Sequence, residues 1–188
     1  DVLGIEGIDT RALTRRVRIH GAMNAAASTV DLDPDSLVAK ARAWEGLEGV
    51  DLARSVTCDT AYEVAPEGDC RHHVVAFDYG IKRNIINCLL AQGCRVTVVP
   101  ATTSADEALG LNPDGIFLSN GPGDPRPLGY AIDTARQLVE RADRPIFGIC
   151  LGHEILGLAL GAKIYKLKFG HRGANQPIRE DSTGRILI

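Results

Sequence analysis

From Val74 onward, short apolar runs with the length of strands alternate with amphipathic stretches with the length of helices. The strand-like runs are apolar throughout, so we expect parallel strands covered by helices on both faces. The sequence therefore predicts an α/β fold with a mostly parallel sheet. In such sheets, ligands bind beyond the carboxyl ends of the strands. The runs that we expect to form strands are "HVVAFDYG", "CRVTVVP", "PDGIFLS", "PIFGI" and, after the last helix, "AKIYKLKFG".

The first 49 residues have a different pattern. Two helices are predicted there: "DTRALTRRVRIHG", which Asp9 or Thr10 can cap, and "DPDSLVAKARAWEG", with Pro34 in its first turn. Between them, the small residues of "AMNAAAST" predict a short strand. Residues 50–73 lack clear periodicity, and we interpret them as a linker.

Composition and charge exclude several classes of function. The formal net charge is -3 and the pI about 6.0, so we expect no nucleic-acid partner. A local basic cluster is better explained as a solvated helix face; it consists of Arg11, Arg15, Arg16 and Arg18. No apolar run is long enough to cross a membrane. The five cysteines lack framework or zinc spacing, which favours a reducing compartment (the cytoplasm or an organelle matrix) and no structural metal.

The stretch "PIFGICLGHE" places Cys150 between an apolar strand and a helix, framed by Gly148 and Gly152. Gly-x-Cys-x-Gly at such a junction is the cysteine form of the nucleophile elbow. The tight turn lifts the sulfur out of the sheet, and the N-terminus of the following helix favours the thiolate. The N–H of Leu151 is then placed to hold an oxyanion. We therefore predict a nucleophilic Cys150.

The loop "SNGPGDP", residues 119–125, follows another expected strand. Two glycines around a proline give a kinked backbone with little bulk, which can turn N–H groups toward a neighbouring site. The same dipeptides are common in ordinary turns, so the loop alone is ambiguous. Together with the elbow, we interpret it as the other wall of an oxyanion pocket.

The other cysteines and the histidines supply no evident partner for Cys150. We expect the remaining thiols to pack in the interior, as free cysteines commonly do: Cys58, Cys70, Cys88 and Cys94. A thiol hydrolase usually needs a histidine base that a carboxylate orients. His153 follows the thiol by one helical turn and is expected to pack or cap. The other candidates lie in the linker or in a glycine-rich bend, and none has a His-x-Glu arrangement: His72, His73 and His171.

Four stretches, "VVAFDYGIKRNI", "FLSNGPGDP", "FGICLGHE" and "ALGAKIYKLKFGHRGANQP", resemble the small chains of glutamine-dependent carbamoyl-phosphate synthase, which are class I glutamine amidotransferases. The upstream "GIDTRALTRRVRIHGAMNAA" resembles the end of the N-terminal domain of those chains. The resemblance implies that residues 1–49 complete that domain and that 50–73 link it to a flavodoxin-like amidotransferase domain beginning at 74–188. The sequence is thus interpreted as an internal fragment.

The resemblance also implies roles for particular residues. Cys150 would attack the side-chain amide of glutamine, while backbone groups of Leu151 and Gly121 hold the oxyanion and Gly123 lines the glutamine pocket. Ammonia would pass to a large synthetase chain that binds ATP and magnesium and makes carbamoyl phosphate for arginine and pyrimidine synthesis. No cofactor is expected in the present chain.

The sequence departs from the family pattern in three ways. The family's His-x-Glu pair falls beyond Ile188, and a serine of the N-terminal domain that contacts glutamine is absent. Glu154 stands where the family has a glutamine that touches the substrate. A carboxylate accepts hydrogen bonds but cannot donate an amide N–H. Two alternatives therefore stay open: a flavodoxin-like module with a redox-sensing thiol and no hydrolysis, and a partner domain that has lost catalysis.

Overall fold

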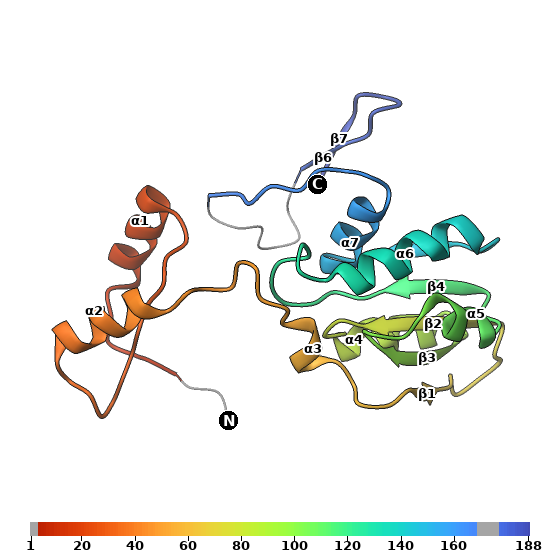
Figure 1. The fold of residues 1–188 in the computed structure, drawn as a ribbon, viewed down its shortest axis with the longest axis horizontal. Helices are drawn as coiled ribbons and strands as arrows, with labels where there is room; N and C mark the ends of the chain where they lie inside the picture. Colours follow the sequence, from red (N-terminus) through yellow and green to blue (C-terminus); the bar gives the residue numbers. More distant parts are fainter. Residues whose placement is uncertain (1–3, 169–176) are drawn as a thin grey trace. The chain divides into compact units, whose positions relative to one another are not determined.

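A computed structural model describes residues 4–168 and 177–188 (Figure 1). The chain divides into two compact units. The first unit comprises Asp1–Gly46 and Tyr165–Ile188, and the second comprises Leu47–Ile164.

The second unit is built on a five-stranded sheet with the order β1-β3-β2-β4-β5. Four of the strands are parallel, and only the short β1 runs antiparallel to its neighbour β3. The parallel strands have the 2-1-3-4 order of flavodoxin-like sheets, and the predicted α/β fold is confirmed. The strands are β1 (Tyr62–Val64), β2 (His72–Asp78), β3 (Cys94–Pro100), β4 (Gly115–Leu118) and β5 (Ile146–Gly148).

Helices cover both faces of this sheet because successive residues of each strand point to opposite faces. Val75 and Phe77 of β2 join the core under α5 (Ala105–Gly110), α6 (Gly129–Arg141) and α7 (Leu151–Ala159). Ala76, between them, joins the core under α4 (Arg83–Ala91) on the other face. Figure 1 shows that α6 and α7 lie on the same side of the sheet.

The face under α4 is only partly covered beside β5. An apolar hollow of about 520 Å³ opens there, lined by Cys88 and Leu89 of α4 and by Phe147 of β5. The prediction that Cys88 packs in the interior is therefore wrong, because its helix face borders this hollow and the residue is exposed. Cys70 is also exposed and Cys58 only half-buried, whereas Cys94 is buried as expected.

The stretch interpreted as a linker contains two short elements, α3 (Ala53–Val56) and the edge strand β1. Ala53 is fully buried in the second unit. The strand β2 begins at His72, so both His72 and His73 belong to the sheet rather than to a linker. Short elements of this kind carry too little periodicity to be recognised in the sequence.

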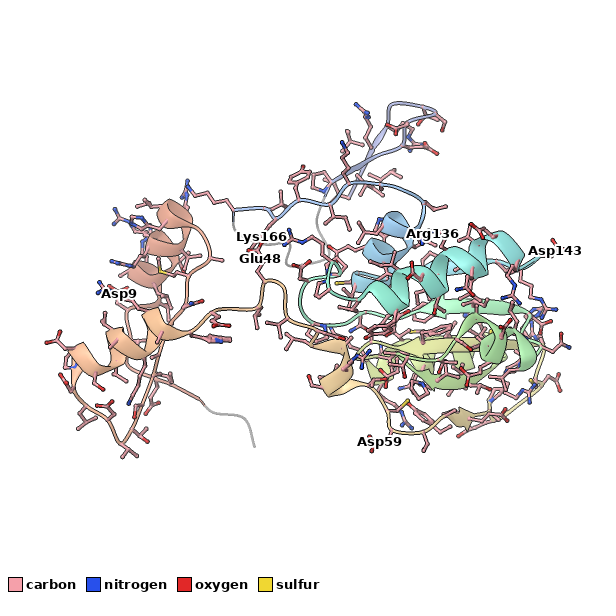
Figure 2. The ribbon with its side chains drawn as sticks, in the orientation of Figure 1. Asp9, Glu48, Asp59, Arg136, Asp143 and Lys166 are labelled. Atoms are coloured by element: carbon pink, nitrogen blue, oxygen red, sulfur yellow. The ribbon has the colours of Figure 1, made fainter. Side chains whose placement is uncertain are left out.

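The first unit contains the two predicted helices, α1 (Thr10–His20) and α2 (Pro34–Ala43). The Asp9 carboxylate accepts a hydrogen bond from the Ala12 N–H (2.8 Å), which caps α1; Asp9 is labelled in Figure 2. The unit also contains a small hairpin of β6 (Ile178–Arg179) and β7 (Ile186–Leu187).

Two predicted strands do not form. Residues 22–29 have no strand, and neither do residues 162–168; the last two residues of that second prediction lie outside the described residues. A strand requires a neighbouring strand to hydrogen-bond with. In these two stretches one backbone bond joins the Ala22 N–H to the Lys168 carbonyl (3.0 Å), which makes no ladder.

Candidate active site at the carboxyl ends of the strands

The carboxyl ends of β2, β4 and β5 lie at the same edge of the sheet because these strands are parallel and adjacent. The chain order reverses between β2 and β4, and ligands of such sheets bind at this switch point. Residues 79–82 follow β2, residues 119–126 follow β4, and Cys150 follows β5. The sheet therefore brings together the elbow and the glycine loop, which the sequence nominated separately.

Cys150 has the backbone geometry of a nucleophile elbow. Its φ is 53° and its ψ -113°, and it is the N-cap residue of α7. A positive φ is uncommon for a residue with a side chain, and such strain is concentrated at functional sites. The residue is exposed, so its thiol is accessible to a substrate.

Both glycines of the elbow are needed for packing. A Cβ on Gly148 would lie 2.6 Å from the Gly152 carbonyl carbon, so the strand and the helix approach too closely for a side chain. A Cβ on Gly152 would lie 2.1 Å from the Leu118 carbonyl oxygen at the end of β4. The glycine frame thus presses α7 directly against the neighbouring strand.

The loop after β4 lies against the elbow. The Gly152 N–H donates to the Ser119 carbonyl (2.9 Å) as well as to the Ile149 carbonyl (3.0 Å). A Cβ on Gly121 would lie 2.2 Å from the Tyr79 carbonyl oxygen and 2.5 Å from Leu151 Cδ2. Gly121 and Leu151 are therefore neighbours, which places two of the predicted oxyanion residues together.

The N–H groups of Leu151 and Gly121 are candidates for holding a ligand at this junction. Leu151 is the first residue of α7, and its N–H has no intrahelical partner. Neither it nor the Gly121 N–H makes a backbone hydrogen bond with any described residue. Such groups beside a nucleophile can hold the negative oxygen of a tetrahedral intermediate.

Polar side chains that the sequence analysis did not single out hold the loops in place. Ser119 Oγ is buried, accepts from the Tyr79 N–H (2.9 Å) and donates to the Asn120 carbonyl (2.8 Å). The Asn120 amide donates to the Gly80 carbonyl (2.9 Å). Asp78 Oδ1 accepts from the Gly80 N–H (2.9 Å). Their position at strand ends was the available signal, but these residues are also common in ordinary turns.

Of the histidines described in the second unit, His153 follows the elbow, while His72 and His73 begin β2. His73 lies at the start of β2, at the opposite edge of the sheet, where its Nε2 is 2.8 Å from Thr97 Oγ1. Burial lowers the pKa of His73, and the nearby Arg95 guanidinium lowers it further. His153 is exposed on α7. His171 lies outside the described residues.

Glu154 lies in the first turn of α7, where its N–H donates to the Cys150 carbonyl (3.0 Å). Residues four apart share one helix face, so the half-buried Glu154 belongs to the Cys150 face of the helix. In the described part of the chain, no three His, Cys, Asp or Glu residues are grouped so that they could hold a metal ion.

Comparison with known proteins identifies the family. The model of class-I glutamine amidotransferases matches residues 75–187, which is more than half of the chain. This chain belongs to the class I glutamine amidotransferases. Membership of this family does not favour the redox-sensing alternative.

Several carbamoyl phosphate synthase small chains are similar to this class I amidotransferase. The protein from Chlorobaculum tepidum is 58% identical over 100% of the chain and 51% of its own length. The protein from Syntrophotalea carbinolica is 52% identical over 100% of the chain and 52% of its own length. The protein from Nostoc sp. is 53% identical over 93% of the chain and 48% of its own length. The chain thus spans about half the length of the curated relatives it matches.

None of the helices in the described residues combines the length and apolar character needed to cross a bilayer.

Proposed function

We propose that this chain carries the glutamine-hydrolysing centre of a carbamoyl-phosphate synthase. The observation that carries the proposal is an exposed Cys150 on a strained elbow, directly beside a glycine loop with available N–H groups. The similarity to carbamoyl phosphate synthase small chains supports glutamine as the amide substrate.

The proposed reaction begins with the Cys150 thiolate, whose sulfur bonds to the side-chain amide carbon of glutamine. The carbonyl electron pair moves to the oxygen, which the N–H groups of Leu151 and Gly121 stabilise. When the carbonyl re-forms, the C–N bond breaks, and the nitrogen takes the proton that the thiol released on ionising and leaves as ammonia. Water then hydrolyses the glutamyl thioester to glutamate and regenerates the thiol. Gly123 lines the glutamine pocket in this proposal.

The ammonia is used by a partner. A large synthetase chain, with ATP and magnesium, joins it to bicarbonate and forms carbamoyl phosphate, while the present chain needs no cofactor. The five free cysteines support a reducing compartment, the cytoplasm or an organelle matrix.

Cys150→Ala in the complete small chain, assembled with its large chain, tests this function. Carbamoyl phosphate synthesis from glutamine should fall to background, because the nucleophile is lost, whereas synthesis from added ammonia should be unchanged. Cys88→Ala is the matched control, since Cys88 is exposed but lies in the hollow under α4. Glutamine-dependent synthesis that survives in Cys150→Ala would refute the proposal.

Residues 1–188 by themselves should not turn over glutamine. His73 lies at the opposite edge of the sheet, and the resemblance puts the family's His-x-Glu pair beyond Ile188. The measurement is ammonia release by the 188-residue chain, with the complete protein as the positive control. Sustained release by the shorter chain would mean that a group within it acts as the base.

Glu154→Gln in the complete protein tests the departure from the family pattern. The glutamine amide can donate a hydrogen bond to the substrate, and the exchange removes a negative charge from the helix face of the thiolate. We expect kcat/KM for glutamine to rise severalfold, with ammonia-dependent synthesis unchanged. Glu180→Gln, on the exposed hairpin of the first unit, is the control. An unchanged kcat/KM would show that the departure is neutral.

A further inference from the structure

A segment before the sheet packs along the outer side of the glycine loop. Residues 48–56, here called the brace, run from Glu48 through α3 and contact the loop formed by residues 119–126. The brace belongs to the second unit. No motif of the sequence analysis included it.

Asp124 is the centre of the contact between brace and loop. Its side chain is only 10% exposed although it is charged. Its carboxylate accepts hydrogen bonds from the Gly49 N–H of the brace (3.2 Å) and from the Arg126 N–H (3.0 Å). Arg126 Nε also donates to both carboxylate oxygens, at 2.9 and 3.0 Å. A carboxylate with this many donors is held in one orientation.

Arg126 connects the same carboxylate to a second one. Its Nη2 lies 2.7 Å from Asp124 Oδ2 and 2.7 Å from Glu48 Oε1, although Glu48 is 78 residues away in the sequence. Glu48 is labelled in Figure 2. The planar guanidinium can make both contacts at once, which the point charge of a lysine does less well.

Apolar packing follows the polar contacts along the brace. A Cβ on Gly123, whose φ is +88°, would lie 3.3 Å from Leu52 Cδ1. A Cβ on Gly80 would lie 3.2 Å from both Val56 Cγ2 and Pro122 Cδ. The brace therefore lies directly against the backbone at Gly80 and Gly123, in the loops that follow β2 and β4.

We propose that Asp124 and Arg126 are positioning residues for amide hydrolysis, because they clamp the brace onto the loop and so fix the Gly121 N–H beside Cys150. The inference rests on the proposed function. Oxyanion donors accelerate a reaction when they are already oriented before charge develops. A Gly-Pro-Gly backbone is intrinsically permissive at its glycines, so its shape must be set from outside. The elbow constrains one side of the loop, and the clamp constrains the other.

The test compares two reactions of the same thiol in the complete protein. Thioester formation from glutamine passes through an oxyanion, whereas alkylation by iodoacetamide does not. Both are followed at Cys150 by rapid quench and peptide mass spectrometry. Asp124→Asn should slow thioester formation about tenfold or more and leave the alkylation rate unchanged. We expect kcat to decrease by a larger factor than the KM for glutamine changes.

Matched variants separate positioning from general destabilisation. Asp133→Asn removes one partner of an exposed ion pair on α6, Asp133 to Arg136 (2.7 Å), and should change neither reaction; Arg136 is labelled in Figure 2. Arg126→Lys keeps the charge but loses the planar fork, so we expect an intermediate loss of thioester formation. If Asp124→Asn does not fold, the rates of thioester formation and alkylation in Arg126→Lys test the positioning role.

The outcomes also separate the inference from the proposed function. If the unmodified protein forms no thioester, the proposed function fails. If it does, and the folded clamp variants form it at the same rate, the positioning role is overturned. Equal slowing of thioester formation and alkylation would also overturn it, because the effect would then not be specific to the oxyanion.

Discussion

Gly152 allows the nucleophile elbow to exist at all, because the end of β4 occupies the space of any side chain. Gly152→Ala would put a Cβ 2.1 Å from the Leu118 carbonyl oxygen. Since backbone rather than a flexible side chain must move, we expect a loss of roughly 3 kcal/mol in the free energy of unfolding. Urea denaturation measures it.

Gly157→Ala is the control in the same helix. There the nearest atom to an added Cβ is the Ala162 Cβ at 3.7 Å, an ordinary contact. Alanine should therefore raise the free energy of unfolding by about 0.5–1 kcal/mol. If the two substitutions change the free energy of unfolding equally, helix propensity and not the close approach to β4 determines the effect.

Tyr79 is a second residue whose environment makes a sharp prediction. It is fully buried, and its hydroxyl has no hydrogen-bond partner among the described residues. Burial raises the pKa of Tyr79 far above its usual range. Because an unpaired buried hydroxyl is unfavourable, Tyr79→Phe should raise the free energy of unfolding by about 1 kcal/mol.

Tyr130→Phe provides the comparison for Tyr79→Phe. The Tyr130 hydroxyl lies 3.4 Å from Asp51 Oδ1, and burial raises the pKa of Tyr130 to about 12. Removing this hydroxyl should be neutral or slightly destabilising. A loss of stability in Tyr79→Phe would mean that the buried hydroxyl has a partner after all.

Among the elements, the loop after β4 should give the second unit part of its acid sensitivity. Hydrogen bonds from Arg126 hold the pKa of Asp124 below its usual value. A carboxyl whose pKa is lower in the folded state stabilises the protein above its unfolded pKa of about 3.9. That contribution is lost as the pH falls through the folded pKa.

The measurement is the free energy of unfolding of the unmodified chain and of Asp124→Asn, each at about pH 7 and about pH 3. The unmodified chain should be the more stable at neutral pH, and the difference should shrink in acid. A difference that stays constant or grows in acid would contradict the assigned direction of the pKa shift.

For the whole molecule, the two units should differ in local stability. No residue of α1 or α2 is buried, whereas β2, β3 and β4 lie between two clusters of buried side chains. Segments with few buried contacts open more readily. Amide hydrogens of α1 and α2 in residues 1–188 should exchange roughly a hundredfold faster than those of β2. Hydrogen exchange with mass spectrometry measures this, and equal protection would contradict it.

The sequence predicted the elements whose patterns are local. Apolar runs followed by helix-length stretches indicated the parallel strands, and both helices of the first unit were confirmed. Predictions failed where the outcome depends on a distant neighbour. Residues 22–29 and 162–168 pair with no strand among the described residues, and Cys88 faces a hollow instead of a core. Neither circumstance is encoded in the spacing of nearby residues.

The candidate site divides in the same way. Sequence alone determined that Cys150 would follow a strand between two glycines, because a tight turn into a helix requires those residues locally. Only the tertiary structure decided that β4 lies beside β5, that Gly121 meets Leu151, and that the brace is clamped by Asp124 and Arg126. These contacts depend on strand order and on packing between segments distant in the sequence, which no local pattern specifies.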